Sequence, residues 1–387
     1  MIYLNIEWRI VMGSKIRHID KPLFFVTLFL FIAGLVMVFS ASNVTAYMSQ
    51  KVSPYNYFFK QGAFLLFGFI LFFVVIKVKP KSYGFISWIG MLAGIGALVG
   101  LFILSQAKNQ AISWYDLGPI SIQPSEFIKI ITIVYLAAYY EKNKNKLTNY
   151  AKCLFPIGIC GIVAFLIFLQ PDLGTMCIYA AIVGTIFLSI PMKKSIKAKT
   201  VIGTIGVALI FGILMLSGTI TQDRQSSRIN DMKNPCDNIL DTGNQVCNCY
   251  IAMNNGGVFG VGLGKSTQKY LYLPEPYTDF IFAIIVEELG IVAGIFLVLL
   301  YMFVLVRILV IGRRSSTNRG CIICYGVAAY IFFHIIVNLM GIMGLIPMTG
   351  VPLPFMSYGG SFTISLIVGL SLVQRVAIDN YSAKEVN

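Results

Sequence analysis

Charged residues are scarce in this chain of 387 residues. Only 12% of the residues are Asp, Glu, Lys or Arg, whereas 57% are hydrophobic. This composition excludes an ordinary soluble domain, which has no need of so much apolar surface. Apolar blocks of about twenty residues recur along the whole chain, as is typical of membrane-spanning helices. The sequence therefore predicts an all-α polytopic membrane protein.

Ten membrane-spanning helices are predicted, within a single membrane domain over residues 1–387. They cover residues 22–42, 57–76, 83–104, 125–140, 153–169, 174–191, 200–218, 279–306, 321–343 and 359–378. Long hydrophilic stretches are otherwise lacking, and the exception is a large loop at 219–278, between the seventh and eighth spans. Two tails remain, at 1–21 and 379–387. Long loops often carry function.

The basic residues follow the predicted spans. With the N-terminus in the cytoplasm, 21 of the 30 Lys and Arg residues fall in loops and tails on the inner side. This bias obeys the positive-inside rule. We expect both termini to be cytoplasmic and residues 219–278 to lie outside. The net charge of +14 is thus a signal of topology, and no basic groove with interleaved aromatic residues points to a nucleic-acid partner.

Histidine is nearly absent, and the two histidines, His18 and His334, are far apart. A histidine metal site is therefore not expected. Three of the eight cysteines, Cys236, Cys247 and Cys249, share the large outer loop. If that side is oxidising, Cys236 can form a disulfide with Cys247 or with Cys249.

Within this charge-poor chain, carboxylates gather near the start of the span at 279–306. The rigid sequence Pro274-Glu275-Pro276 leads to Thr278, a natural N-cap residue, so that Asp279 is expected in the first turn at the outer membrane boundary. A carboxylate there suits a general base that acts on a hydroxyl of a membrane-bound substrate. The alternative is a plain helix cap.

Two more acids, Glu287 and Glu288, lie deeper in the same span. Glu287 is about 12 Å farther along the helix than Asp279. On helical geometry Glu287 shares the cavity of Asp279, whereas Glu288 lies nearly opposite and is expected to pair elsewhere.

Two further places combine charge with an apolar setting. Glu126 and Lys129 are three residues apart and thus on one helix face. They form either a structural ion pair or part of a polar cavity. Asp172 lies in a tight outer turn, either as a helix cap or as a functional residue.

The sequence GLIPMTGVPLPFMSYGGSF, at 344–362, links the last two spans. Its prolines and glycines indicate irregular backbone, which at membrane depth must be buried in protein or line a wet cavity. Ser357, Tyr358 and Ser361 are hydrogen-bond donors suited to such a cavity.

These motifs together resemble the SEDS family (shape, elongation, division and sporulation), the FtsW/RodA proteins of bacterial cell-wall synthesis. The matching motifs, which extend over roughly residues 20–380, are WYDLGPISIQPSEFIK, QPDLGT, GGVFGVGLGKSTQKYLYLPEPYTDFIFAIIVEELG and MTGVPLPFMSYGGSF. The segment GKSTQKYLYLPE looks more like the division branch than the elongation branch.

The resemblance implies a glycosyltransferase in the bacterial cytoplasmic membrane that polymerises lipid II at the outer face, at the division septum or during elongation. It implies that Asp279 is the catalytic residue. The residues expected to bind substrate are Glu126, Lys129, Asp172, Arg228, Lys269, Glu275, Ser357 and Ser361. A divalent cation, Mg or Mn, would stabilise the leaving diphosphate, and no organic cofactor is expected.

The implied partners are lipid II, undecaprenyl-diphosphate-linked glycan, membrane lipid, a class B penicillin-binding protein and other divisome or elongasome proteins. Two other readings stay open, a lipid II transporter (flippase) and a non-catalytic scaffold. The chain departs from the family pattern at Ser113, where an arginine is usual, and at Asn244, Asn248 and Cys249.

Overall fold

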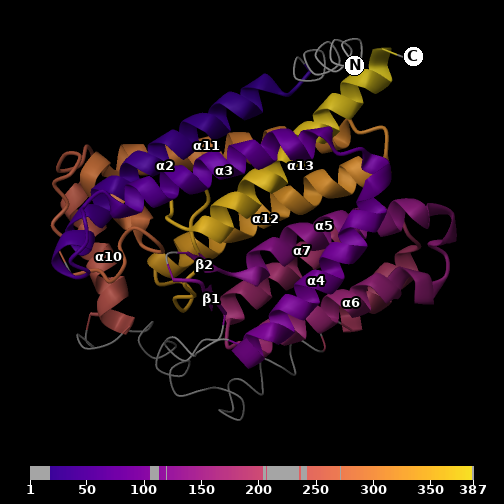
Figure 1. The fold of residues 1–387 in the computed structure, drawn as a ribbon, viewed down its shortest axis with the longest axis horizontal. Helices are drawn as coiled ribbons and strands as arrows, with labels where there is room; N and C mark the ends of the chain where they lie inside the picture. The colour runs from indigo at the N-terminus through magenta and orange to yellow at the C-terminus, as the bar shows by residue number, and fades with distance from the viewer. Residues whose placement is uncertain are drawn as a thin grey trace.

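A computed structural model gives the structure of the chain (Figure 1) and describes residues 18–104, 113–118, 120–203, 206, 235–236, 242–270 and 272–385. The helices are α2 (Lys21–Met48), α3 (Asn56–Lys77), α4 (Tyr83–Leu104), α5 (Pro124–Lys142), α6 (Tyr150–Leu169), α7 (Leu173–Ser189), α10 (Thr242–Gly256), α11 (Ile281–Arg313), α12 (Asn318–Ile342) and α13 (Gly360–Glu385). Two short strands, β1 (Tyr115–Asp116) and β2 (Ser121–Ile122), pair antiparallel before α5. Single 3-10 turns occupy Pro80–Ser82 and Lys144–Lys146.

The prediction of an all-α polytopic membrane protein is confirmed. Within the described part of the chain, seven helices are long and apolar enough to cross a membrane: Lys21–Met48, Asn56–Lys77, Pro80–Leu104, Tyr150–Leu169, Ile281–Arg313, Asn318–Ile342 and Gly360–Ala383. α7 is apolar but has only 17 residues, and α5 carries charge at both ends. The predicted span at 200–218 lies almost entirely outside the described residues.

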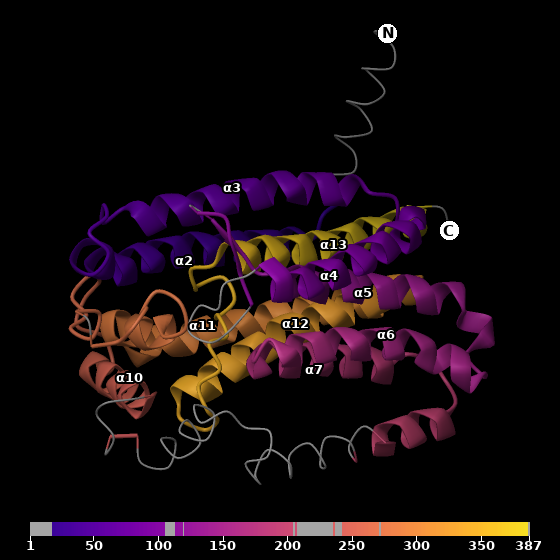
Figure 2. The ribbon, with the colours of Figure 1, turned by 60° about the horizontal axis from the view of Figure 1, so that its bottom comes forward.

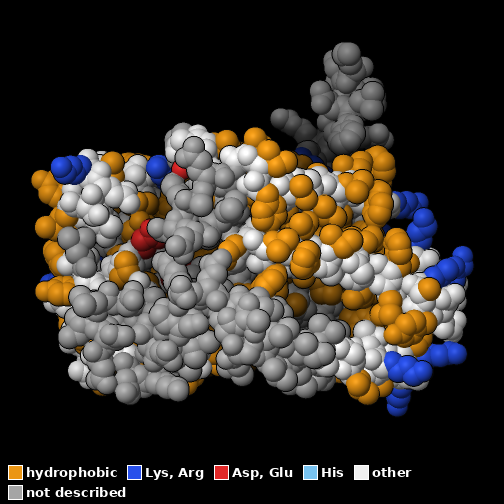
Figure 3. Space-filling model, turned by 90° about the horizontal axis from the view of Figure 1, so that it is seen from below, with side chains coloured by type: hydrophobic (Ala, Val, Ile, Leu, Met, Phe, Trp, Pro, Cys, Tyr) orange, Lys and Arg blue, Asp and Glu red, His pale blue; other side chains and the backbone are white. Residues whose placement is uncertain are grey.

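The helices alternate in direction, so that each end of the bundle gathers segments distant in sequence. At one end, Asp20 caps α2, forms an ion pair of 2.8 Å with Arg307 of α11, and exchanges two hydrogen bonds with Gln374 of α13. At the other end, Gln61 of α3 donates to Thr363 of α13 at 3.0 Å. On the face that Figure 3 shows, Lys and Arg side chains are more numerous at the right, which is the end where α2 begins and α13 ends in Figure 1. That this end faces the cytoplasm stays a prediction.

α12 and α13 form the centre of the bundle, with α2 and α3 on one side and α4 to α7 on the other (Figures 1 and 2). In the apolar stretch of α13, 83% of the residues are buried inside the protein, whereas in the apolar stretch that includes α4 only 22% are buried. The two central helices also carry polar side chains, among them His334, Asn338 and Gln374, which are buried. Protein neighbours can satisfy such groups, whereas lipid cannot.

Several predicted boundaries differ from the structure. α2 continues past residue 42 to Met48, and α13 continues to Glu385, so most of the predicted tail at 379–387 is helical. The large loop contains a helix that was not predicted, α10, whose N-terminal part is tied to Cys236 by a disulfide from Cys247. The disulfide prediction is thus confirmed for Cys247, while Cys249 is a free and buried thiol.

Candidate functional site

Asp279 lies just before α11 and not in its first turn. The helix begins at Ile281, and Phe280 is the N-cap residue without a side-chain cap. The prediction that Thr278 caps this helix is wrong, because its hydroxyl donates to the Glu275 carbonyl at 2.8 Å and closes a turn of its own. Asp279 therefore sits on the approach to the helix, where its side chain is half-buried.

The backbone around Asp279 is fixed by α12 and by the irregular segment at 343–359. Asn338 of α12 donates from its amide to the carbonyls of Asp279 and Val351, both at 2.8 Å. A Cβ atom on Gly350, whose φ is +68°, would lie 3.5 Å from Asp279 Oδ2. The segment at 343–359 therefore passes directly beside the carboxylate of Asp279.

Ser357, predicted to line the cavity, instead holds this approach in place. Its hydroxyl donates to the Thr278 carbonyl at 2.6 Å and accepts from the Leu353 amide at 2.8 Å. The Tyr358 amide donates to the Tyr277 carbonyl at 2.9 Å. Hydrogen bonds from backbone and side chains thus join the segment that leads to Asp279 to the irregular segment at 343–359.

Asp172 and Ser361 lie around the same segment. Asp172 caps α7 by accepting from the Thr175 amide at 3.0 Å, as the cap interpretation predicts. It also accepts from the side chain of Gln123 at 3.3 Å, and the Gln123 amide donates to Ser361 at 3.0 Å. A Cβ atom on Gly174, two residues into the α7 turn, would lie 2.8 Å from Thr349 Cβ. The outer ends of α5, α7, α11 and α13 thus meet at one place, around residues 349–361.

Glu126 and Lys129 form a buried charged cluster on α5, as the sequence predicts. Lys129 Nζ lies 2.8 Å from Glu126 Oε1, and Lys129 and Glu126 are 0% and 2% exposed. Tyr330 of α12 donates its hydroxyl to Glu126 at 3.3 Å, and His334 Nε2 lies 3.0 Å from Lys129 Nζ. A single helical turn separates His334 from Asn338, so this cluster lies about 5–6 Å deeper than the contact to Asp279.

His334 is part of the cluster as a neutral acceptor. Its Nδ1 lies 2.7 Å from the Tyr330 carbonyl, which only accepts, so Nδ1 carries the proton. Nε2 is then free of hydrogen and accepts from the Lys129 ammonium. Sequence reasoning considered His334 only as a metal ligand. The signal for its actual role was a polar pair, His334 and Asn338, four residues apart on an apolar span.

The deeper acids face a different part of the chain. Glu287 accepts hydrogen bonds from residues 266–268, so the expectation that it shares the cavity of Asp279 is not met. Glu288 pairs elsewhere, as expected, with Lys269 at 3.0 Å. Lys269, predicted to bind substrate, is 1% exposed and is enclosed by Glu288 and the Gly264 carbonyl.

The other residues that the sequence singles out are Glu275, Arg228, Asn244, Asn248 and Ser113. Glu275 is exposed beside Asp279, in a backbone conformation with φ of +47°. Arg228 lies outside the described residues, as does the side chain of Asn244. Asn248, a departure from the family pattern, donates to the Tyr272 carbonyl at 2.8 Å and so ties α10 to the segment that leads to Asp279. Ser113, another departure, is buried and donates to the Gln170 carbonyl at 3.4 Å.

A divalent cation needs several oxygen or nitrogen donors that converge on one point. Within the described ranges, no group of three or more His, Cys, Asp or Glu side chains is placed to hold one. The expected divalent cation therefore stays a prediction, and no step of the proposed reaction depends on it.

Comparison with known proteins decides the family. Residues 21–382 match the sequence profile of the FtsW/RodA/SpoVE family, described as cell cycle proteins. The chain belongs to the FtsW/RodA/SpoVE family. The match extends from the start of α2 nearly to the end of α13, so the whole bundle is the family domain.

Curated members of the family align over almost their full length. The chain is 35% identical to "Probable peptidoglycan glycosyltransferase FtsW" of Bacillus subtilis (strain 168), over 95% of this chain and 93% of that protein. It is 34% identical to "Stage V sporulation protein E" of the same organism, over 95% of this chain and 99% of that protein.

Solved structures share the family fold. One comes from work on the structural coordination of polymerization and crosslinking by a peptidoglycan synthase complex, with a TM-score of 0.73, 23% identity, and coverage of 94% of this chain and 98% of that chain. Another is the Rod shape determining protein RodA of Thermus thermophilus, with a TM-score of 0.67, 23% identity and the same coverage.

Proposed function

We propose that this chain is a peptidoglycan glycosyltransferase that polymerises lipid II into glycan strands at the outer face of the cytoplasmic membrane. The observation that carries the proposal is the setting of Asp279. Its carboxylate is half-buried at the end of the bundle opposite the basic end, while Asn338 and Ser357 fix the adjoining backbone. Family members with this activity in their names support it.

In the proposed reaction Asp279 is the general base. It takes the proton from a sugar hydroxyl of the acceptor lipid II as that oxygen attacks the anomeric carbon of the growing strand. The new glycosidic C–O bond forms while the anomeric C–O bond to undecaprenyl diphosphate breaks, and the diphosphate leaves with the electron pair. A carboxylate held by its fixed backbone beside Gly350 is positioned for this transfer before substrate arrives.

The residues near Asp279 have complementary roles in the proposal. Glu275 is exposed and free to contact a sugar, and Asp172 with Ser361 borders the same segment. Lys129 lies about one turn deeper, buried against Glu126 and His334, so in the proposal it acts on the negative diphosphate through its charge and not through direct contact. Glu126 holds that cation in place. Arg228 is proposed as a further cation toward the diphosphate.

The proposed setting is a multi-pass protein with both termini in the cytoplasm, working beside a class B penicillin-binding protein that cross-links the strands. A solved complex that coordinates polymerization with crosslinking supports this partner class. Relatives named FtsW and a sporulation protein support a role in division or a related process.

The test is polymerisation of purified lipid II by matched amounts of variants in the presence of the partner transpeptidase. Asp279→Asn keeps the shape but removes the base, so the rate should fall about 10²- to 10⁴-fold. The control is Asp379→Asn, at the opposite end of the bundle, where the asparagine oxygen still accepts from Arg375 and the rate should match that of the parent. Parental activity of Asp279→Asn would refute the assignment. A parent protein that only moves lipid II across vesicles, or only binds division proteins, would favour a flippase or a scaffold.

A further inference from the structure

α11 is interrupted in the middle, at Gly290, where φ is 85° and ψ is 169°. In an unbroken helix the amides of Ile291 and Val292 would donate to the carbonyls of Glu287 and Glu288. Here they donate instead to the carbonyls of Gly257 and Val258, at 3.0 and 3.4 Å. The helix is thus divided into an outer half, Ile281–Leu289, and an inner half that continues to Arg313.

The loop after α10 replaces the hydrogen bonds that the break removes. The carbonyls of Glu287 and Glu288 accept from the amides of Val261 and Gly262, at 3.0 and 2.9 Å. Only glycine permits this close approach, because a Cβ atom on Gly290 would overlap the Val258 carbonyl, and one on Gly260 would overlap the Glu288 carbonyl. The glycine-rich sequence between α10 and Lys265 therefore serves backbone contact with α11.

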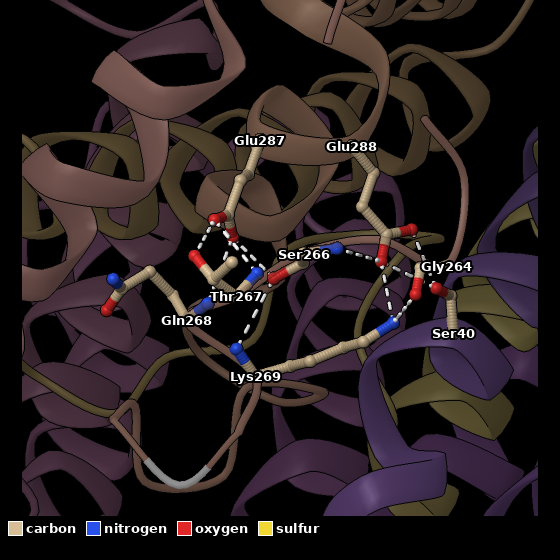
Figure 4. A network of polar contacts seen from close by, with 8 residues as sticks. All are labelled: Ser40, Gly264, Ser266, Thr267, Gln268, Lys269, Glu287 and Glu288. Carbon is tan, nitrogen blue, oxygen red and sulfur yellow. Dashed lines mark hydrogen bonds and ion pairs between the residues drawn. The ribbon is translucent and has the colours of Figure 1, made fainter. Parts of the chain in front are cut away.

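The side chains of the same two glutamates complete the contact (Figure 4). The Glu287 carboxylate accepts from the Ser266 hydroxyl, from the Thr267 amide and hydroxyl at 3.1 and 2.8 Å, and from the Gln268 amide at 3.4 Å. Both glutamates are 0% exposed. Oxygen atoms of Glu287 are thus satisfied by neutral donors of one short segment, and removal of that segment would leave a buried charge.

Glu288 adds a charge and a third helix. Its carboxylate pairs with the Lys269 ammonium at 3.0 Å and accepts from the Ser40 hydroxyl of α2 at 2.6 Å. In Figure 4 the Lys269 side chain extends below Ser266 to reach Glu288 and Gly264. We name the residues that make these contacts, Gly257–Gly262 and Ser266–Lys269 together with Glu287 and Glu288, the α11 clamp.

We propose that the α11 clamp positions Asp279, with Glu287, Glu288 and Lys269 as positioning residues; this rests on the proposed function. The outer half of α11 starts two residues after Asp279, and the break at Gly290 cuts its hydrogen-bond ladder from the inner half. Its orientation is therefore set by the packing of its buried side chains and by polar contacts at its two ends. Asn338 and Ser357 hold the end near Asp279, and the clamp holds the other.

This assignment separates Lys269 from the substrate. Its cation neutralises Glu288 within the protein and does not reach the reacting diphosphate. The two roles predict different behaviour when both partners of the ion pair are changed. A positioning pair tolerates replacement of both charges, whereas a substrate cation cannot be restored by a change at Glu288.

The experiment compares Lys269→Met, Glu288→Gln and the double variant in the full-length protein, with lipid II and the partner transpeptidase. Each single change strands one buried charge, and a misplaced base should lower kcat about 10- to 100-fold with little change in KM. Glu288 also accepts from the Ser266 backbone amide at 3.4 Å, and in the double variant the glutamine side chain keeps this bond and the bond from Ser40. The methionine side chain keeps the apolar stem, so kcat should return to within about threefold of the parent. The matched control is Lys265→Gln, an exposed lysine of the same loop, which should match the parent.

Ser40→Ala is the milder probe if a single variant fails to fold. It removes one hydrogen bond to Glu288 and should lower kcat by about 3- to 10-fold, again without a change in KM. A double variant as slow as Lys269→Met, or a raised KM in the single variants, would overturn the proposal in favour of Lys269 acting on substrate. Parental kcat in every clamp variant would also overturn it. Failure of the parent itself to polymerise lipid II would refute the proposed function instead.

Discussion

Removing one charge from the Glu126–Lys129 cluster should be far more harmful than removing both. Lys129→Met leaves the Glu126 carboxylate buried with the Tyr330 hydroxyl, 3.3 Å away, as its remaining donor from that cluster. Both residues are almost fully enclosed, and breaking such a pair typically costs about 3–5 kcal/mol. The free energy of unfolding of Lys129→Met should therefore fall by about that amount.

The double variant Glu126→Gln, Lys129→Met strands no charge. The oxygen of the introduced glutamine side chain still accepts from the Tyr330 hydroxyl, which bonds Glu126 Oε2 in the parent, and its amide group takes the place of Oε1, the atom that faces Lys129. Most of the lost stability should return. If the Lys129 charge also stabilises the leaving diphosphate, by about 1.5–3 kcal/mol as one charge-assisted contact does, its loss should make polymerisation about 10- to 100-fold slower.

Two measurements separate these effects, an unfolding titration in mixed micelles and lipid II polymerisation by the same preparations. Parental stability of Lys129→Met would refute the reasoning about buried charge. A stable double variant that polymerises at the parental rate would show that the cluster is structural and has no contact with the reaction.

Three further outcomes are expected. A single cysteine introduced by Lys265→Cys, in a chain otherwise free of reactive thiols, should be labelled by an impermeant maleimide on intact cells; labelling only after the cells are opened would reverse the topology. Cys249 should resist maleimide in the folded protein, since burial raises the pKa of its thiol and shields the thiol from the reagent. Cys247 should react once its disulfide to Cys236 is reduced. Equal labelling of Cys247 and Cys249 before reduction would contradict the structure. Gly290→Ala should lower the free energy of unfolding by about 1–3 kcal/mol, because the backbone conformation at Gly290 suits only glycine. The control is Gly62→Ala, where an added Cβ atom meets no atom within 4 Å, and this change should be neutral or slightly stabilising. Equal thermal stability of the two variants would argue against the break in α11.

The spans could be predicted because a membrane imposes one simple rule on long segments. Blocks of about twenty apolar residues must cross it, and basic residues mark the inner loops. The contact between Glu126 and Lys129 could also be predicted from local spacing, since residues three apart on a helix share a face. The disulfide of Cys236 was predicted with two alternatives, and only the fold of α10 selects Cys247.

What the sequence did not reveal depends on contacts between distant residues. Thr278 looks like a cap in isolation, but the turn from Glu275 uses its hydroxyl and the helix starts later. In the sequence Lys269 resembles a solvated cation of an outer loop. Its burial becomes evident only when that loop packs against α11 and Lys269 contacts Glu288. His334 has no local feature that indicates Lys129, 205 positions away, as its partner.

The break at Gly290 also bears on how the chain enters the membrane. The inner half, Ile291–Arg313, is about 34 Å long at 1.5 Å per residue, enough by itself to cross a hydrocarbon core of about 30 Å. The outer half is only about 13 Å long, and it carries both Glu287 and Glu288. The insertion machinery can therefore release the inner half, whose charged residues Arg307 and Arg313 lie toward its C-terminal end, into lipid without transferring either acid. We therefore expect the outer half to fold against its own loop after the inner half has inserted, which would make assembly of the Asp279 region a late step in biogenesis.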